Sequence, residues 1–467
     1  MNAERRLTAS PVLAFVAALL PACASTSAAP AFRDTAQLVE ARSGHRMFWN
    51  QGAADDEAVA RRVHDLLSRD LSLDAAIQIA LLDNRDLQAL YEDLSIAQAD
   101  LVQAGLLKNP TLSAGVTVPV AGADVQTGFG VGVVQDFLGL FLLSARKKVA
   151  SAELEATKLR VGNAVLREAF AVKVAYYTLL AAQQVLDMRR AVVQASEAGM
   201  ALAQAAHAAG NISDLDLVSQ QTLFEQLRTD VKRSEADVGG AREELTRHLG
   251  LWGPDVAFHT PSRLPDPSAA DPALEHLEGL AIARRLDLAS AHQETLALSR
   301  AAALARTSRF LGAPSAGVSF ERAPERYSAI TPSASLELPI FDQHQAEIAR
   351  LEARMRQAQA REAALAVDIR SEVRAAHARS VAMRDVVDRY SRVVVPLRQQ
   401  VVDLSQEQYG AMLLGAPQLL LAKQNAINAQ RELIEALRDY WIARADLERA
   451  VGAAFPAAPA PGPETAP

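Results

Sequence analysis

The residues with the clearest capacity for chemistry are two carboxylates, Asp214 and Asp216, which follow a Gly210-Asn211 break between two helical patterns. Ser213 stands three residues before Asp216, which is the spacing of a helix capping box. Acidic side chains in a first helical turn also interact favourably with the helix dipole. We therefore expect this pair to cap a helix, and any further role depends on what surrounds it.

No group of residues in the sequence indicates catalysis. The nine histidines are scattered along the chain, and the motifs HExxH, GxSxG and GxxxxGK[ST] do not occur. The net charge of -7 gives no basic footprint for nucleic acid. The sequence therefore predicts no enzyme, no cofactor, no metal site and no nucleic-acid partner.

Long helices are the elements expected to position these carboxylates. The chain of 467 residues is only 5% aromatic, and alanine and charged residues interleave along it. That composition suits helices packed side by side more than a thick aromatic core. Apolar residues at helical spacing predict helices over residues 71–107 (capped by Ser72), 145–207, 214–249, 275–310, 342–408 and 417–451.

Two hairpins, at 111–137 and 315–341, interrupt the helices with apolar residues at every second position. Each strand is near the length that crosses a bilayer when tilted, and after the N-terminus no stretch is apolar enough for a membrane-spanning helix. One such strand alone would suit an ordinary half-buried sheet edge. Four strands with one pattern, each beside a very long helix, favour a membrane sheet whose lipid-facing row includes Leu112, Ala114, Val116, Val118, Leu336, Leu338 and Ile340.

The N-terminus is typical of an export signal. Arg5 and Arg6 precede an apolar run, and Leu20-Pro21-Ala22-Cys23 resembles the bacterial lipobox. This predicts a lipoprotein-type signal peptide over residues 1–23, acylation of Cys23 and, because Ala24 is not Asp, sorting to the outer membrane. Cleavage at a nearby small-x-Ala site, which leaves Cys23 in the discarded peptide or as a free thiol, is the alternative. Cys23 is the only cysteine, so the chain can form no internal disulfide.

The chain carries one plan twice, at an offset of about 200 residues. Asp86-Leu87 corresponds to Asp287-Leu288, and Leu249-Gly250 corresponds to Val451-Gly452. The expected organisation is a peripheral segment (24–70), a first repeat (71–252), a Pro-rich linker (253–274), a second repeat (275–452) and a disordered tail (453–467). Four strands are too few to close a barrel, and open edges are costly in lipid, so the chain must oligomerise.

With these features the sequence resembles the TolC-like outer-membrane efflux factors over about residues 70–452. The resemblance is carried by Ser72–Ala76 through Asn109–Ser113, by Leu336–Phe341, and by the breaks at His207–Asp216 and Tyr409–Gln424. It implies a mainly α fold with a membrane β-barrel: a homotrimer with a twelve-stranded barrel in the outer membrane of a Gram-negative bacterium and a helical tunnel in the periplasm. A periplasmic adaptor and an inner-membrane pump would be its partners.

The resemblance also gives the two helical breaks a second interpretation. In the family these breaks are the periplasmic tips that narrow the tunnel, and acidic side chains there form rings in the trimer. Asp214 and Asp216 would then attract cations at the first tip, besides capping a helix. At the second tip Tyr409 keeps the family's aromatic position, but Gln418 replaces an acid and Met412 a glycine. A gate of the family type is therefore in doubt.

The resulting hypothesis is a passive export duct whose energy comes from a partner pump. A periplasmic coiled-coil adaptor or structural protein without a barrel is the alternative, since it shares long helices and an export signal. Two matched hairpins favour the duct. The cargo stays open among drugs, metal ions and secreted protein, because no Cys, His or Met cluster marks it.

Overall fold

The computed structural model describes residues 25–52, 54–118, 127–267, 273–322 and 327–455. The signal peptide with Cys23, the loop at 120–126 and the end of the tail lie outside these ranges. The described part is mainly helical, with four strands. Its helices are α2 (Ala29–Ser43), α3 (Ala54–Leu67), α4 (Leu73–Asp83), α5 (Arg85–Ala104), α6 (Leu138–Ala208), α7 (Asp214–Leu249), α8 (Leu277–Arg284), α9 (Leu286–Ser308), α10 (Gln345–Arg389), α11 (Val395–Gly410) and α12 (Ala416–Val451).

The chain divides into two compact units. The strand unit comprises residues up to 31, 93–155 and 293–356, and the helical unit comprises residues 32–92, 156–292 and 357–467.

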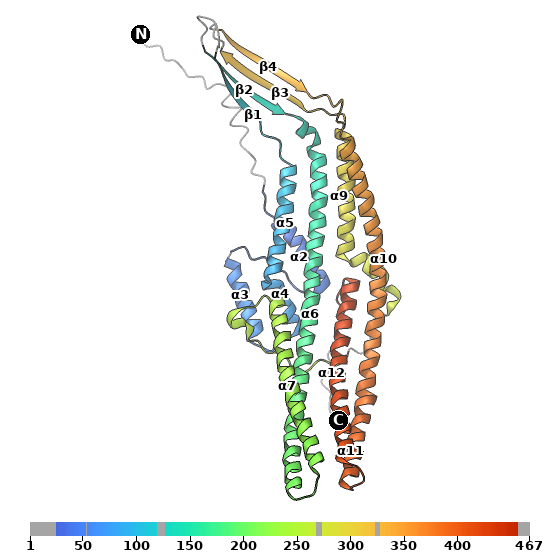
Figure 1. The fold of residues 1–467 in the computed structure, drawn as a ribbon. Helices are drawn as coiled ribbons and strands as arrows, with labels where there is room; N and C mark the ends of the chain where they lie inside the picture. The colour runs from blue at the N-terminus through green and yellow to red at the C-terminus, as the bar shows by residue number, and fades with distance from the viewer. Residues whose placement is uncertain (1–24, 53, 119–126, 268–272, 323–326, 456–467) are drawn as a thin grey trace, which may run out of the picture. The chain divides into compact units, whose positions relative to one another are not determined.

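One antiparallel sheet forms the centre of the strand unit. Its strands are β1 (Thr111–Thr117), β2 (Gly128–Asp136), β3 (Pro314–Arg322) and β4 (Ser328–Leu336), in the order β1-β2-β3-β4 (Figure 1). The two hairpins, far apart in sequence, therefore pair through β2 and β3 into a single sheet. β1 and β4 are its edges within the described residues, so each has one side without a strand partner.

The same order of elements occurs twice, as the offset in the sequence predicts. Helices α4, α5, α6 and α7 with β1 and β2 correspond to α8, α9, α10–α11 and α12 with β3 and β4. α7 and α12 are both 36 residues long, and each ends at a left-handed glycine, Gly250 and Gly452, with φ of 74°. Glycine adopts this conformation without steric cost, which explains why both repeats end in it.

Several predicted helix bounds differ from those observed. Ser72 caps α4 as predicted, but the expected helix 71–107 is broken at Asn84, and the expected helix 275–310 is broken at the corresponding Arg285. In each repeat a short helix thus precedes a longer one. Helix α6 begins at Leu138, seven residues before the predicted start. The prediction began too late because the apolar run Leu138–Leu143 shows no helical spacing in the sequence.

Helix α2 was not predicted from the sequence. Its buried side chains include Thr35 and Val39, so one position of its core stripe is polar and the apolar pattern is weak. A Cβ added at Gly162 of α6 would lie 3.7 Å from a methyl group of each of these residues and 3.0 Å from Leu286. Gly162 therefore permits α2, α6 and α9 to pack closely.

The long helix predicted up to residue 408 is not continuous. A π-helical segment, η3 (Tyr390–Val394), separates α10 from α11, and the Val395 amide donates to the Tyr390 carbonyl, five residues back. Pro396 follows directly. It has no N–H, and its ring clashes with the carbonyl four residues earlier in a regular α-helix, so a local change of pitch is expected here.

The β4 region also differs from the predicted strand at Ser333–Ile340. β4 spans Ser328–Leu336, so Leu338 and Ile340 follow the strand instead of lying in it. Pro339 lacks an amide hydrogen for a strand ladder, and the Ile340 amide donates to the Leu338 carbonyl in a tight turn.

Candidate functional site: a two-faced sheet, two helical tips and two joints

The sheet has one apolar face and one face of small, mostly polar residues. Leu112 pairs with Val133, which pairs with Val318, and Ala114, Val131, Phe320 and Ile330 form the next row of the same face. Between these rows, on the opposite face, lies the row Ser113, Gly132, Ser319 and Thr331. The rings of Phe129 and Phe320 meet edge to face, with centroids 6.5 Å apart. Such a sheet suits lipid on one side and water on the other.

The predicted lipid-facing residues are all exposed, but they do not all lie in strands. Leu112 and Val116 lie in β1, and Leu336 ends β4 opposite Pro314. Val118 follows the last residue of β1, and Leu338 and Ile340 follow β4. The exposed apolar row therefore continues for a few residues beyond the sheet.

At the first tip, in the helical unit, Asp214 and Asp216 differ in their surroundings. The capping box is confirmed: Ser213 Oγ accepts from the Asp216 amide at 3.2 Å and donates to Asp216 Oδ2 at 2.8 Å. The Asp214 carboxylate is 93% exposed and lies 2.6 Å from Nε2 of His207, at the end of α6. Asp216 is thus bound into the helix start, whereas Asp214 projects toward solvent.

The second tip, between α11 and α12, presents apolar side chains. Met412 is 94% exposed and has a φ of 61°, a left-handed conformation in which glycine would be unstrained. Tyr409 is partly exposed at the end of α11, and Gln418 lies in the first turn of α12, close to Gly415. No acidic residue stands in the first turn of α12. The two tips therefore differ in charge.

Each repeat contains a polar joint, not predicted from the sequence, where a short helix meets a long one. The first joint consists of Asn84, Glu168, His248 and Gly250. Asn84 Nδ2 donates to the His248 carbonyl at 2.8 Å and to Glu168 Oε1 at 3.3 Å, and the same carboxylate oxygen lies 2.7 Å from His248 Nδ1. The amide side chain also caps α5, since Asn84 Oδ1 accepts from the Leu87 amide.

His248 has its pKa raised from the ordinary value, chiefly by the hydrogen bond to Glu168, while partial burial opposes that increase. Glu244, whose Oε1 lies 3.3 Å from His248 Nε2, raises the pKa further, and Arg247 lowers it. The first joint therefore contains a side chain whose charge depends on pH.

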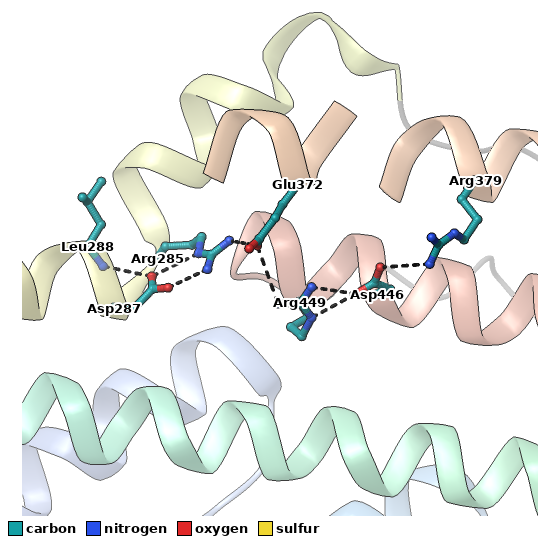
Figure 2. Close-up of polar contacts among 7 residues, drawn as sticks. All are labelled: Arg285, Asp287, Leu288, Glu372, Arg379, Asp446 and Arg449. Atoms are coloured by element: carbon teal, nitrogen blue, oxygen red, sulfur yellow. Dashed lines mark hydrogen bonds and ion pairs between the residues drawn. The ribbon is translucent and has the colours of Figure 1, made fainter. Parts of the chain in front are cut away.

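The second joint, Arg285, Glu372, Arg449 and Gly452, stands at the corresponding place with different chemistry (Figure 2). Arg285 binds both carboxylate oxygens of Asp287 and also donates to Glu372. Arg449 Nη1 lies 3.7 Å from Glu372 Oε2, and its Nη2 lies 2.8 Å from Asp446. Because arginine stays protonated at physiological pH, the second joint keeps its charge where the first does not.

The corresponding glycines and the spacing of Glu168 and Glu372 could have pointed to these joints. The correspondence of Asp86-Leu87 with Asp287-Leu288 places Asn84 opposite Arg285, but the two side chains share no chemistry, so the alignment did not mark them as functionally equivalent. The contacts that unite each joint are long-range, and a one-dimensional pattern does not contain them.

A cavity of about 690 Å³ adjoins the second joint in the helical unit. Most of its charged lining residues already have partners, including Arg285, Arg449 and Lys173, which pairs with Glu448. Within the described ranges, no group of three or more His, Cys, Asp or Glu side chains is placed to hold a metal ion. The prediction that no stretch after the N-terminus is apolar enough to span a membrane was too strict: within those ranges α6 alone passes by length and composition, but half of its apolar window is buried, as in a core helix.

Residues 76–251 match the model of the outer membrane efflux protein family. No curated protein matches the chain. Among solved structures, CusC matches with a TM-score of 0.70 at 17% identity, over 82% of this chain and 93% of that chain. A membrane protein from Pseudomonas aeruginosa matches with a TM-score of 0.70 at 23% identity, over 81% and 92% of the two chains.

The outer-membrane channel CmeC from Campylobacter jejuni matches with a TM-score of 0.70 at 14% identity, over 81% of this chain and 85% of that chain. These likenesses concern the fold, and they extend over both repeats. Together with the family match over residues 76–251, they show that the chain has the fold of outer-membrane channels such as CmeC.

Proposed function

We propose that this chain is the passive outer-membrane duct of a tripartite efflux system, assembled as a homotrimer. The observation that carries the proposal is the four-stranded sheet with one apolar face, one small polar face and two unpaired edges. Such a sheet is not stable alone in lipid, where every unsatisfied backbone group costs several kcal/mol. Three copies joined from β4 to β1 would give twelve strands, an apolar outer surface and a polar lumen.

The helical tips are the proposed sites of contact with a periplasmic adaptor, which would link the duct to an inner-membrane pump. Leu215, at the start of α7, and Met412 and Leu413, in the turn between α11 and α12, are exposed apolar side chains of the kind that mark contact with another protein. The same turns would form the constriction of the tunnel, with Asp214, Asp216, Tyr409 and Gln418 around it.

A lipid on Cys23 is part of the proposal and rests on the lipobox-like sequence alone. It would anchor the mature N-terminus in the outer membrane, while the barrel makes its own contact with lipid. Mass spectrometry of the mature protein tests this directly: an unmodified N-terminus beyond residue 23 excludes the lipid.

Reconstitution tests the duct. The purified full-length protein should form a trimer after chemical cross-linking in mild detergent, and it should conduct ions when added to a planar bilayer. A periplasmic coiled-coil adaptor predicts the opposite pattern, with recovery in the soluble periplasmic fraction and no conductance. That pattern would contradict the duct.

A further inference from the structure

One surface of the strand unit combines exposed apolar side chains with three lysines, of which Lys147 and Lys148 have no acidic partner among the described residues. This α5–α6 patch lies where α5 leads into β1 and β2 leads into α6. It consists of Leu106, Leu107, Lys108, Phe137, Leu140, Phe141, Lys147 and Lys148.

Direct contacts bring the two segments of the patch together. Lys108 Nζ lies 3.0 Å from Asp136 Oδ2, and the Lys108 carbonyl accepts from the side chain of Gln135 at 3.0 Å. A Cβ added at Gly105 would lie 3.3 Å from the Cδ and Cε atoms of Lys147, so the stem of this lysine rests on the end of α5. Lys147 therefore stands beside Leu106 and Leu107.

The apolar and basic residues of α6 share one face of the helix. Lys147 follows Leu140 by seven residues, and Lys148 follows Phe141 by seven, so each lysine lies on the same side as its apolar counterpart and about 10 Å farther along the axis. Leu140 and Phe141 are 51% and 69% exposed. Lysine stems of this length can lie along an apolar surface while the ammonium reaches water or a headgroup.

The charge of the patch is positive. Within the described residues, no carboxylate lies within ion-pair distance of Lys147 or Lys148, and Asp136 is already paired with Lys108. Two ammonium groups thus remain for an outside anion.

The corresponding place in the second repeat differs, because the cations nearest its exposed phenylalanines are paired with acids or stacked on a ring. Phe310 and Phe341 are exposed there too, but Arg306 lies 2.6 Å from Glu352, and His344 lies 3.2 Å from Glu347. The Arg309 guanidinium lies over the Phe310 ring, 5.0 Å from its centroid. Exposed apolar residues therefore follow both hairpins, whereas unpaired lysines follow only the first.

From this contrast we propose that the α5–α6 patch binds an anionic phospholipid of the bilayer that surrounds the barrel. Leu140 and Phe141 enter the acyl region, and Lys147 and Lys148 bind the phosphate of the headgroup. The inference rests on the proposed membrane barrel, since the patch borders the strand ends where the bilayer surface would be. A basic segment at such a surface gains affinity for anionic lipid, by roughly a factor of five for each lysine or arginine.

The test uses full-length protein reconstituted in phosphatidylcholine vesicles that contain spin-labelled phosphatidylglycerol or spin-labelled phosphatidylcholine. Electron paramagnetic resonance measures how much of each lipid is immobilised by the protein. The wild type should prefer phosphatidylglycerol, and Lys147→Gln/Lys148→Gln should reduce that preference at least about fivefold. Salt should weaken the wild-type preference. Arg350→Gln, at the position in α10 that corresponds to Arg146, is the matched control and should keep it.

Equal immobilisation of phosphatidylglycerol by the wild type and the double lysine variant would overturn the inference, including the case in which a neighbouring subunit or another protein covers the lysines. Conductance in planar bilayers separates this result from failure of the duct. If the wild type conducts but shows no lipid preference, only the lipid site is wrong; if it neither inserts nor conducts, the proposed function itself is wrong.

Discussion

His248 is the residue whose charge responds to pH at a helix joint. Its pKa is raised in the folded protein, so the stability that the Glu168 contact provides is fully present below the unfolded value near 6.5 and is lost as pH rises through the folded pKa. His248→Gln should therefore destabilise the protein by about 1.5–3 kcal/mol at pH 6, the range for a hydrogen bond to a charged group, and by less at pH 9.

Thermal unfolding followed by circular dichroism at both pH values measures this difference. His292→Gln is the control, because that histidine pairs with Glu362 on an exposed surface. A destabilisation by His248→Gln that is the same at pH 6 and pH 9 would show that the ring contributes packing and not charge.

The close contacts of Gly250 at the first joint lead to a second prediction for a single residue. A Cβ there would lie 2.8 Å from the Asp83 carbonyl oxygen and 2.9 Å from Asn84 Cα, on a backbone with positive φ. Gly250→Ala should cost more than the roughly 1–2 kcal/mol of the left-handed backbone alone. Gly210→Ala shares the positive φ but meets nothing within 4 Å, so it isolates the backbone cost. Equal melting temperatures for the two variants would refute the close contact at the joint.

At the scale of the elements, substitutions on the two faces of strand β3 test the assignment of the faces to lipid and water. Val318 lies on the apolar face and Ser319 on the polar face of β3, one residue apart. Val318→Arg should cost about 2–4 kcal/mol if it meets lipid near the midplane, whereas Ser319→Arg should cost far less. The yield of folded protein in outer-membrane fractions, with urea titration in vesicles, measures the difference. A similar loss for both would mean that the faces do not separate lipid from water.

Period-two and helical spacing sufficed to predict the hairpins, most helices and the tandem plan. The errors fell where one residue overrides a pattern. Asn84 and Arg285 end helices because their side chains bind to distant segments, and Pro396 alters the helix without ending it. Of the candidate site, the cap at Ser213 and Asp216 was predictable because it is local. The joints were not, since Glu168 and His248 meet only after the helices have packed.

At the scale of the whole molecule, the proposed homotrimer would contain three copies of Asp214. Its exposed carboxylate contrasts with that of Asp216, which is held by Ser213. If Asp214 faces the axis, the ring should favour cations, and Asp214→Asn/Asp216→Asn should shift selectivity partly toward zero, because asparagine keeps the cap and the second tip has no acid in its first turn.

Reversal potentials of single channels in a salt gradient measure this selectivity. Asp214→Asn alone should account for most of the shift. Glu225→Gln, which removes an acid from α7 away from the turn, should leave the selectivity unchanged. If the double variant keeps the wild-type selectivity, both acids serve the helix alone.

The π-helical segment η3 changes which residues of the following helix, α11, lie on its buried face. Buried residues of α10 from Ile369 to Val387 are separated by four, three, four and seven residues, and the same count continued would pass through Leu397 and Val401. Instead Val402 is buried against Ala422 and Ala426, and Val401 is exposed. One residue has been added to the count, as a single wider turn requires.

In evolutionary terms, η3 acts as a one-residue insertion that rotates the residues of α11 around the helix axis relative to those of α10. Leu397, Val401 and Leu404 keep coiled-coil spacing, but all three are exposed. Helix α11 therefore carries an exposed apolar stripe in addition to its buried side, and the stripe arises from the shift in position and not from substitutions. A one-residue deletion in η3 would return these three residues to the buried side, and the exposed stripe would disappear with it.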